Sequence, residues 1–106
     1  MFEQYSVYWV DLNPTRGGEM NKIRPCVILS PTETNQHFLT VVIAPITTTD
    51  LGLPTRSRVN LVNASGFIAV DQIRALDKAR FCQKIGDLSE GEIKTVKEII
   101  KEYLIA

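Results

Sequence analysis

The stretch LTVVIAPI, Leu39–Ile46, is the part of the sequence that decides the fold. It is a short apolar run rich in β-branched residues, which is typical of a buried strand. A similar run, PCVILS, covers Pro25–Ser30, and the segment Tyr5–Leu12 is rich in aromatic and β-branched residues. The first half of the chain is therefore predicted to be made of strands.

Further strand-like runs follow at short intervals. Ser57–Val62 alternates apolar and polar residues, as a half-buried strand does, and the runs Gly66–Ile73 and Arg80–Ile85 come after it. Turn signals such as Asn13-Pro14 and Ser30-Pro31 separate the runs. Short strands joined by turns, with no helices between them, predict a small antiparallel barrel or a strongly bent sheet.

The C-terminal segment has a different pattern. Ser89 followed three residues later by Glu92 forms a capping box, which satisfies N–H groups at the start of a helix. Apolar residues then recur at helical spacing, namely Ile93, Val96, Ile99, Ile100, Tyr103 and Leu104. The predicted fold class is thus mainly β with one C-terminal α-helix, and 106 residues fit a single domain spanning 1–106.

Charge and cysteine content limit the classes of function. Twelve Lys and Arg balance twelve Asp and Glu, which counts against coating nucleic acid by bulk charge but leaves room for a local basic site. No secretory signal or membrane-length apolar run is present, so we expect a cytoplasmic protein without membrane association. Cys26 and Cys82 lack metal or redox spacing and lie in apolar-rich segments, which predicts two buried, reduced thiols; a disulfide is the alternative.

Metal and histidine chemistry find little support. The chain has one histidine, His37, expected on the surface of a loop, so a two-histidine acid–base pair cannot form within one chain. No zinc-like motif, carboxylate cluster or nucleotide-binding loop occurs. We expect no metal and no cofactor.

The loop Pro14–Arg24 is the first candidate site. One acid, Glu19, lies among the cations Arg16, Lys22 and Arg24. A carboxylate in such surroundings stays ionised and can accept a proton, and an arginine fork fits a phosphate. Taken alone, the segment also fits a solvated hairpin loop.

Two later segments complete the candidates. Threonines at the end of the third run, Thr47, Thr48 and Thr49, offer hydroxyls to a phosphate, although threonine is also a common strand residue. A polar trio interrupts a later strand at Asp71, Gln72 and Arg74. Because buried polar groups need partners, the trio can equally serve to orient the other two segments.

Read together and in order, these segments resemble the toxins of the MazF/PemK family. The blocks that carry the resemblance are Tyr8–Glu19, Arg24-Pro25, Val27–Pro31, Ala44–Thr48, Val70–Arg74, Lys84–Gly86, and Leu88-Ser89 with the final helix. The ordered set covers nearly the whole chain and is more specific than any one block.

The resemblance implies an SH3-like barrel, usually a homodimer, that acts as a sequence-specific endoribonuclease and is neutralised by an antitoxin. By motif position, the family's catalytic arginine corresponds to Arg24, its catalytic threonine to Thr47 and its loop acid to Glu19. Some relatives carry an arginine two residues before the aspartate, where this chain has Ala69. A mechanism built on that arginine together with Asp71 is therefore not expected here.

The family resemblance leads to a chemical hypothesis. Glu19 accepts the proton of the RNA 2′-hydroxyl, Arg24 clamps the phosphate electrostatically, and Thr47 donates a hydrogen bond to it. The expected substrate is single-stranded RNA (mRNA), whose unstacked bases expose their edges. Supporting or RNA-binding roles are expected for Arg16, Lys22, Thr48, Asp71, Gln72 and Arg74.

The sequence is also compatible with two other functions. The same barrel carries gyrase-poisoning toxins of the CcdB type, but these end in Trp-Gly-Ile, whereas this chain ends in Tyr103–Ala106 and has its only tryptophan at Trp9. The neutral net charge would also suit a catalytically inactive module that binds RNA or a partner. Cleavage assays with RNA separate both alternatives from a nuclease.

Overall fold

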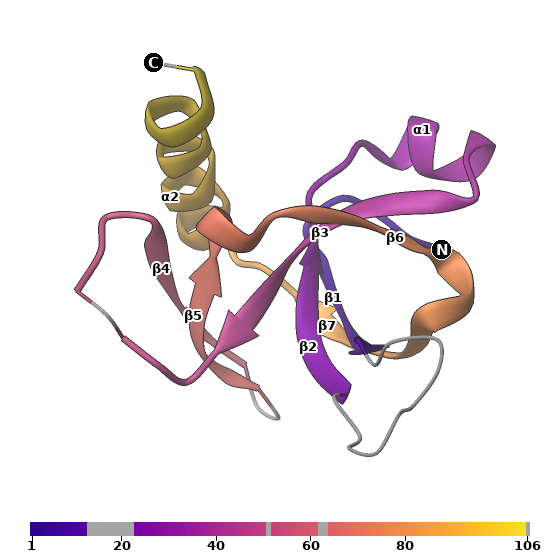
Figure 1. Cartoon of the computed structure of the whole chain (residues 1–106), viewed down its shortest axis with the longest axis horizontal. Helices are drawn as coiled ribbons and strands as arrows, with labels where there is room; N and C mark the ends of the chain where they lie inside the picture. The colour runs from indigo at the N-terminus through magenta and orange to yellow at the C-terminus, as the bar shows by residue number, and fades with distance from the viewer. Residues whose placement is uncertain (13–22, 51, 62–63, 106) are drawn as a thin grey trace.

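The computed structural model describes residues 1–12, 23–50, 52–61 and 64–105 (Figure 1). Its strands are β1 (Ser6–Asp11), β2 (Ile23–Ile28), β3 (Thr40–Thr47), β4 (Arg56–Asn60), β5 (Ser65–Ala69), β6 (Arg74–Asp77) and β7 (Phe81–Asp87). The α-helices are α1 (Thr32–His37) and α2 (Glu90–Ile100). Short helical turns are η1 (Val70–Gln72), η2 (Lys78–Arg80) and the π-helical η3 (Lys101–Ile105).

Strand β3, formed by the apolar run Leu39–Ile46, lies at the centre of the sheet. The strand order is β4-β5-β3-β2-β1-β7, and β6 pairs with β3 beside β5. One edge of β3 pairs with β2, while the other edge pairs first with β6 and then with β5. Every strand pair found within the described residues is antiparallel, as the sequence predicts.

The chain connections force this sheet to curl. Strands β6 and β7 stand at opposite edges of the succession β6-β3-β2-β1-β7, yet only η2 separates them along the chain. In a flat sheet those edges would be about 19 Å apart. The connection from Asp77 to Phe81 spans at most about 14 Å. The sheet therefore bends into a half-barrel, which confirms the predicted strongly bent, mainly β fold.

Apolar cores lie on both faces of the sheet. Val27 and Leu29 point into a cluster that includes Val96 of α2, so this core fills the space between sheet and helix. Cys26 and Ile28 point the other way, into a cluster built from β1, β2, β3 and β6. Because successive side chains of a strand alternate between faces, two-sided burial explains the uninterrupted apolar run Cys26–Leu29 at the end of β2.

Helix α2 begins at the predicted capping box. The Ser89 Oγ accepts the Glu92 N–H at 3.2 Å, and the Glu92 carboxylate accepts the Ser89 N–H at 2.8 Å. The second Glu92 oxygen accepts the backbone N–H of Asn60 in β4 at 3.0 Å. One glutamate thus starts the helix and fixes it to the sheet.

Some predictions about the elements were wrong. The six-residue helix α1 lies between β2 and β3, where no helix was expected, and His37 is the exposed last residue of this helix. A helix this short shows no apolar periodicity in the sequence. The predicted strand Gly66–Ile73 ends at Ala69, after which the chain forms η1 and then β6, which was not predicted.

The cysteines differ from each other. Cys26 is fully buried, as predicted, but Cys82 is exposed because it faces outward on β7, an edge strand. Both thiols are free. Burial raises the pKa of the Cys26 thiol to about 12. The prediction of two buried thiols was therefore half wrong.

Candidate functional site: a cationic pocket at a break in strand pairing

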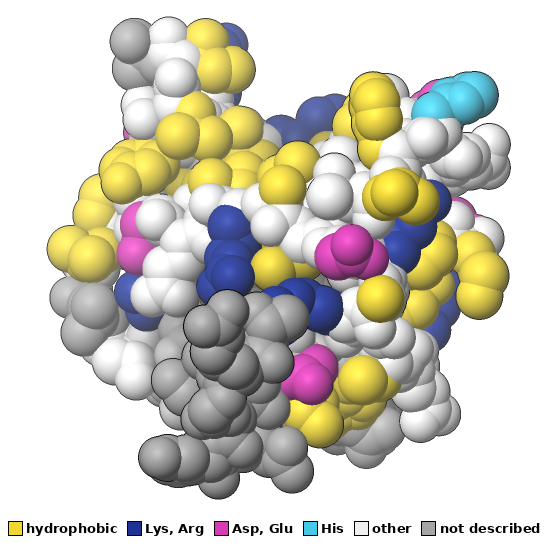
Figure 2. All heavy atoms as spheres, turned by 45° about the vertical axis from the view of Figure 1, so that its right-hand side comes forward, with side chains coloured by type: hydrophobic (Ala, Val, Ile, Leu, Met, Phe, Trp, Pro, Cys, Tyr) yellow, Lys and Arg dark blue, Asp and Glu magenta, His cyan; other side chains and the backbone are white. Residues whose placement is uncertain are grey.

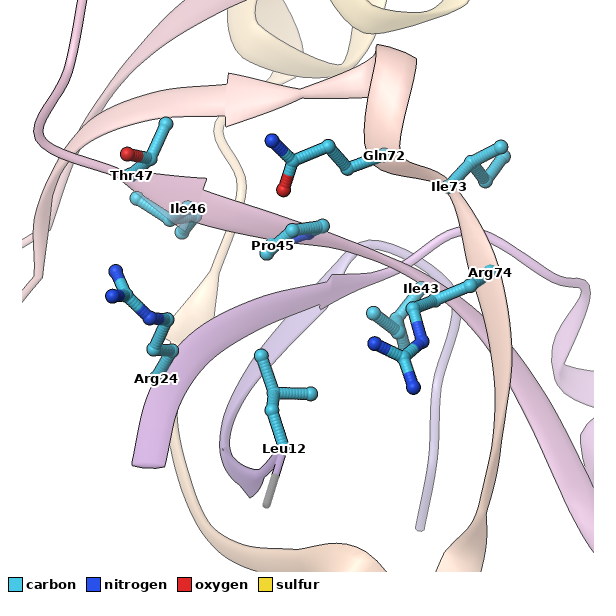
Figure 3. A pocket seen from close by; sticks show the side chains of 9 residues that line it. All are labelled: Leu12, Arg24, Ile43, Pro45, Ile46, Thr47, Gln72, Ile73 and Arg74. Atoms are coloured by element: carbon cyan, nitrogen blue, oxygen red, sulfur yellow. The ribbon is translucent and has the colours of Figure 1, made fainter. Parts of the chain in front are cut away.

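A pocket opens where β3 changes its partner strand. Pairing with β6 ends at Ile43 and pairing with β5 begins at Ile46. Pro45, which lies between them, has no N–H to offer a neighbouring strand. Turn η1 crosses this gap, and a pocket of about 580 Å³ lies there (Figure 3). Its lining residues are Leu12, Arg24, Ile43, Pro45, Ile46, Thr47, Gln72, Ile73 and Arg74.

The register of β2 and β3 brings Arg24 and Thr47 together. Cys26 pairs with Pro45. Continuing this antiparallel register by two residues sets Arg24 opposite Thr47, with both side chains on the same face. Figure 3 shows both side chains at the same end of the pocket. Two of the three residues expected to act in catalysis therefore share one pocket.

The Thr47 hydroxyl is oriented by its own strand end. The backbone N–H of Thr49 donates to Thr47 Oγ1 at 3.2 Å. Since the oxygen accepts this bond, and no acceptor among the described residues takes the hydroxyl hydrogen, that hydrogen is available to a ligand.

Electrostatically, the pocket suits an anion. Among the described lining residues the charged ones are Arg24 and Arg74, both cations and both exposed. Figure 2 shows Lys and Arg side chains close together near the middle of the face turned to the viewer. Apolar walls and the Gln72 amide complete the lining. A phosphate with an attached base fits this combination of cations, apolar surface and amide.

Asp71 does not line this pocket. Its carboxylate forms an ion pair with Arg56, in which Nε lies 2.9 Å from Oδ1, and it also accepts the Thr55 hydroxyl at 3.0 Å. Hydrogen bonding from Arg56 is the main cause that lowers the pKa of Asp71, and the same pairing raises the pKa of Arg56. Asp71 therefore supports the neighbouring segments rather than facing the pocket.

The other predicted residues divide into two groups. Thr48 is exposed and is not among the lining residues. Arg16, Glu19 and Lys22 lie outside the described residues. Arg56 was missed by the sequence analysis because nothing in an alternating strand distinguishes a buried arginine from an exposed one.

Among the described residues, no three His, Cys, Asp or Glu side chains come together in a group able to hold a metal ion. No helix in this part of the chain is long and apolar enough to cross a membrane.

Comparison with known proteins supplies the family. A family model described as "PemK-like, MazF-like toxin of type II toxin-antitoxin system" matches residues 3–104. The chain belongs to this PemK/MazF toxin family. The match spans every described strand and both α-helices of the chain.

Individual members of the PemK/MazF family resemble the chain over most of its length. Endoribonuclease MazF of Staphylococcus saprophyticus is 33% identical, over 94% of this chain and 88% of the relative. A MazE-MazF structure from Deinococcus radiodurans has a TM-score of 0.85 at 22% identity and covers 96% of this chain and 94% of that one. A mycobacterial endoribonuclease solved with its cognate antitoxin has a TM-score of 0.81 at 23% identity, covering 96% and 93%. The structural matches agree with the fold described above.

Proposed function

We propose that this PemK/MazF-family chain is an endoribonuclease toxin of a type II toxin-antitoxin system that cuts single-stranded RNA in the pocket between Arg24 and Thr47. The observation that carries the proposal is the meeting of a guanidinium and a hydroxyl, from separate strands, in one cationic pocket. The relative that is 33% identical is named an endoribonuclease, which favours a nuclease over a gyrase poison.

RNA supplies its own nucleophile in the proposed reaction. The 2′-hydroxyl loses its proton to a base, and its oxygen attacks the adjacent phosphorus to give a pentacovalent phosphorane. The bond from phosphorus to the 5′ oxygen then breaks, and that oxygen takes a proton from solvent. The products are a 2′,3′-cyclic phosphate and a 5′-hydroxyl, and no metal-bound water is required.

Each pocket residue has a role in this scheme. Arg24 stabilises the charge that develops on the phosphorane, and Thr47 donates its hydroxyl hydrogen to a phosphate oxygen. Arginine stays protonated, so Arg24 serves as an electrostatic group and not as a base. Glu19, five residues before Arg24 in the chain, is the proposed proton acceptor. Arg74 and Gln72 bind the flanking RNA.

The proposal includes partners and location. An antitoxin neutralises the enzyme, in line with the relatives solved in complex with one. The active form is a homodimer of single-domain chains, and it acts in the cytoplasm, where its mRNA substrates lie. Arg16, Lys22 and Thr48 are proposed to add contacts to the RNA.

A cleavage assay with two matched substrates tests the proposed function. The purified protein is incubated in EDTA with a long single-stranded RNA of mixed sequence and with DNA of the same sequence. Discrete RNA fragments with 2′,3′-cyclic phosphate ends, and intact DNA, are expected. Intact RNA would favour the inactive binding module, while cut DNA or dependence on a metal would contradict the 2′-hydroxyl route.

A further inference from the structure

The side chain of Arg56 is almost fully enclosed, which is unusual for an arginine. Only 4% of its side chain is exposed, whereas arginines in proteins are mostly exposed. Its Nε donates to Asp71 Oδ1 at 2.9 Å and its Nη2 donates to Asp71 Oδ2 at 3.3 Å. This two-point contact fixes the plane of the guanidinium. Arg56 is therefore held rigidly by Asp71.

The remaining arm of Arg56 reaches the end of β3. Its Nη1 donates to the carbonyl oxygen of Thr49 at 2.9 Å. The N–H of the same Thr49 donates to Thr47 Oγ1 at 3.2 Å. One residue, Thr49, thus connects the fixed guanidinium to the hydroxyl in the pocket.

The wall of the pocket that η1 forms is attached to the same Arg56–Asp71 ion pair. Asp71 belongs to η1, and the next residue, Gln72, lines the pocket. The N–H of Val70 donates to the carbonyl of Thr55, which precedes Arg56, at 3.2 Å. The ion pair therefore fixes η1 and the end of β3 relative to each other.

We propose that Arg56 is a positioning residue for RNA cleavage: held by Asp71, it fixes Thr49 and thereby orients the Thr47 hydroxyl toward the bound phosphate. The inference rests on the function proposed above and concerns the same pocket. Being buried, Arg56 acts through Thr49 and Thr47 rather than by touching RNA.

The variant Arg56→Lys separates the positioning role of the side chain from its positive charge. Arginine contacts Asp71 and Thr49 through different nitrogens, whereas lysine offers one nitrogen on a flexible stem. Since a carboxylate attracts an ammonium more strongly than a neutral carbonyl does, the ammonium of Arg56→Lys is expected to turn to Asp71 and to release Thr49. The charge is retained while the connection to Thr47 is lost.

Single-turnover and steady-state cleavage of the RNA then test the inference. Arg56→Lys is expected to lower kcat about tenfold to a hundredfold with little change in KM, because misplacement of a reacting group slows the chemical step. The matched control is Arg58→Ala on the same strand, whose side chain is exposed and contacts the ring of Phe67. This control is expected to keep the kcat of the wild type.

A double variant shows whether Arg56 acts through Thr47. In a Thr47→Ala background, Arg56→Lys is expected to cost less than about twofold further in kcat, because the group it orients is absent. If the losses in kcat of the two single variants multiply in the double variant, or if Arg56→Lys alone keeps full activity, the inference is overturned. Arg56 would then be a purely structural residue.

An NMR measurement keeps this inference separate from the proposed function. Three-bond couplings report the χ1 angle of Thr47 in the free protein, without RNA. One rotamer is expected in the wild type and rotamer averaging in Arg56→Lys, with the core side chains unchanged. RNA left uncut by the wild type would refute the proposed function, whereas identical Thr47 couplings in both proteins would refute the role of Arg56.

Discussion

Replacing Gly66 by alanine tests how closely β5 must approach the end of β3. A Cβ at this position would lie 2.5 Å from the carbonyl oxygen of Thr47 and 3.2 Å from its carbonyl carbon. Ordinary contact begins near 3.4 Å, so the two strands must separate by about 0.9 Å. The two nearest obstructing atoms belong to the backbone, which cannot turn away as a flexible side chain can.

The displacement falls on Thr47, the residue proposed to donate a hydrogen bond to the phosphate. A shift of about 1 Å in a reacting group can cost about a hundredfold in rate. Overpacking of this kind also destabilises a protein by about 1–3 kcal/mol. Gly66→Ala is therefore expected to cut RNA about ten to a hundred times more slowly under single-turnover conditions, and to unfold at lower urea concentration.

Gly91 in α2 provides the matched control. A Cβ there meets nothing within 4 Å, and the position is helical and exposed. Gly91→Ala should stabilise the protein by about 0.5 kcal/mol and leave the cleavage rate unchanged. If Gly66→Ala cut RNA as fast as the wild type while folded, the geometry of the site proposed here would be refuted.

Three further predictions concern stability and thiol access. Asp71→Asn should cost about 2–3 kcal/mol at pH 7, because it leaves the enclosed Arg56 guanidinium without a countercharge. Because the folded-state pKa of Asp71 is lowered, the stability that its carboxylate contributes is complete above the ordinary aspartate pKa of about 3.9 and is lost as the pH falls through the lower folded-state value. A difference in urea stability between the wild type and Asp71→Asn that stays constant from pH 7 to pH 3 would contradict this. In the native protein a thiol reagent should label Cys82 quickly and Cys26 only on unfolding, since burial raises the pKa of the latter thiol to about 12; rapid labelling of both would argue against the packing of β2. Glu92→Ala should lower the free energy of unfolding by about 1–2 kcal/mol, because it removes the capping box and the bond to Asn60; unchanged urea stability would contradict that role.

The strands of the first half and the C-terminal helix could be predicted because their signals are local. Leu39–Ile46 and Pro25–Ser30 carry short, β-branched apolar runs that are typical of buried strands, and Ser89 with Glu92 marks a helix start by spacing alone. The boundary at Ala69 was missed because η1 is set by the change of partner along β3. No local pattern reports such a long-range pairing.

The candidate site was predictable in its residue types but not in its arrangement. Arg24 and Thr47 were identified from family motifs, while their placement opposite each other follows from the β2–β3 register. That register depends on the length and path of the connection through α1, which was not expected. Arg56 could not be found from sequence because its burial results from η1 folding over β4.

The central claim is that the pocket at the end of β3 is the site of RNA cleavage. The most direct test compares single-turnover RNA cleavage by the wild type, Arg24→Ala and the exposed-arginine control Arg58→Ala, at equal folded concentration. Arg24→Ala is expected to be about 10²–10³ times slower, as for the loss of a group that stabilises transition-state charge, while Arg58→Ala keeps the wild-type rate. Cleavage by Arg24→Ala at the rate of the wild type would contradict the account.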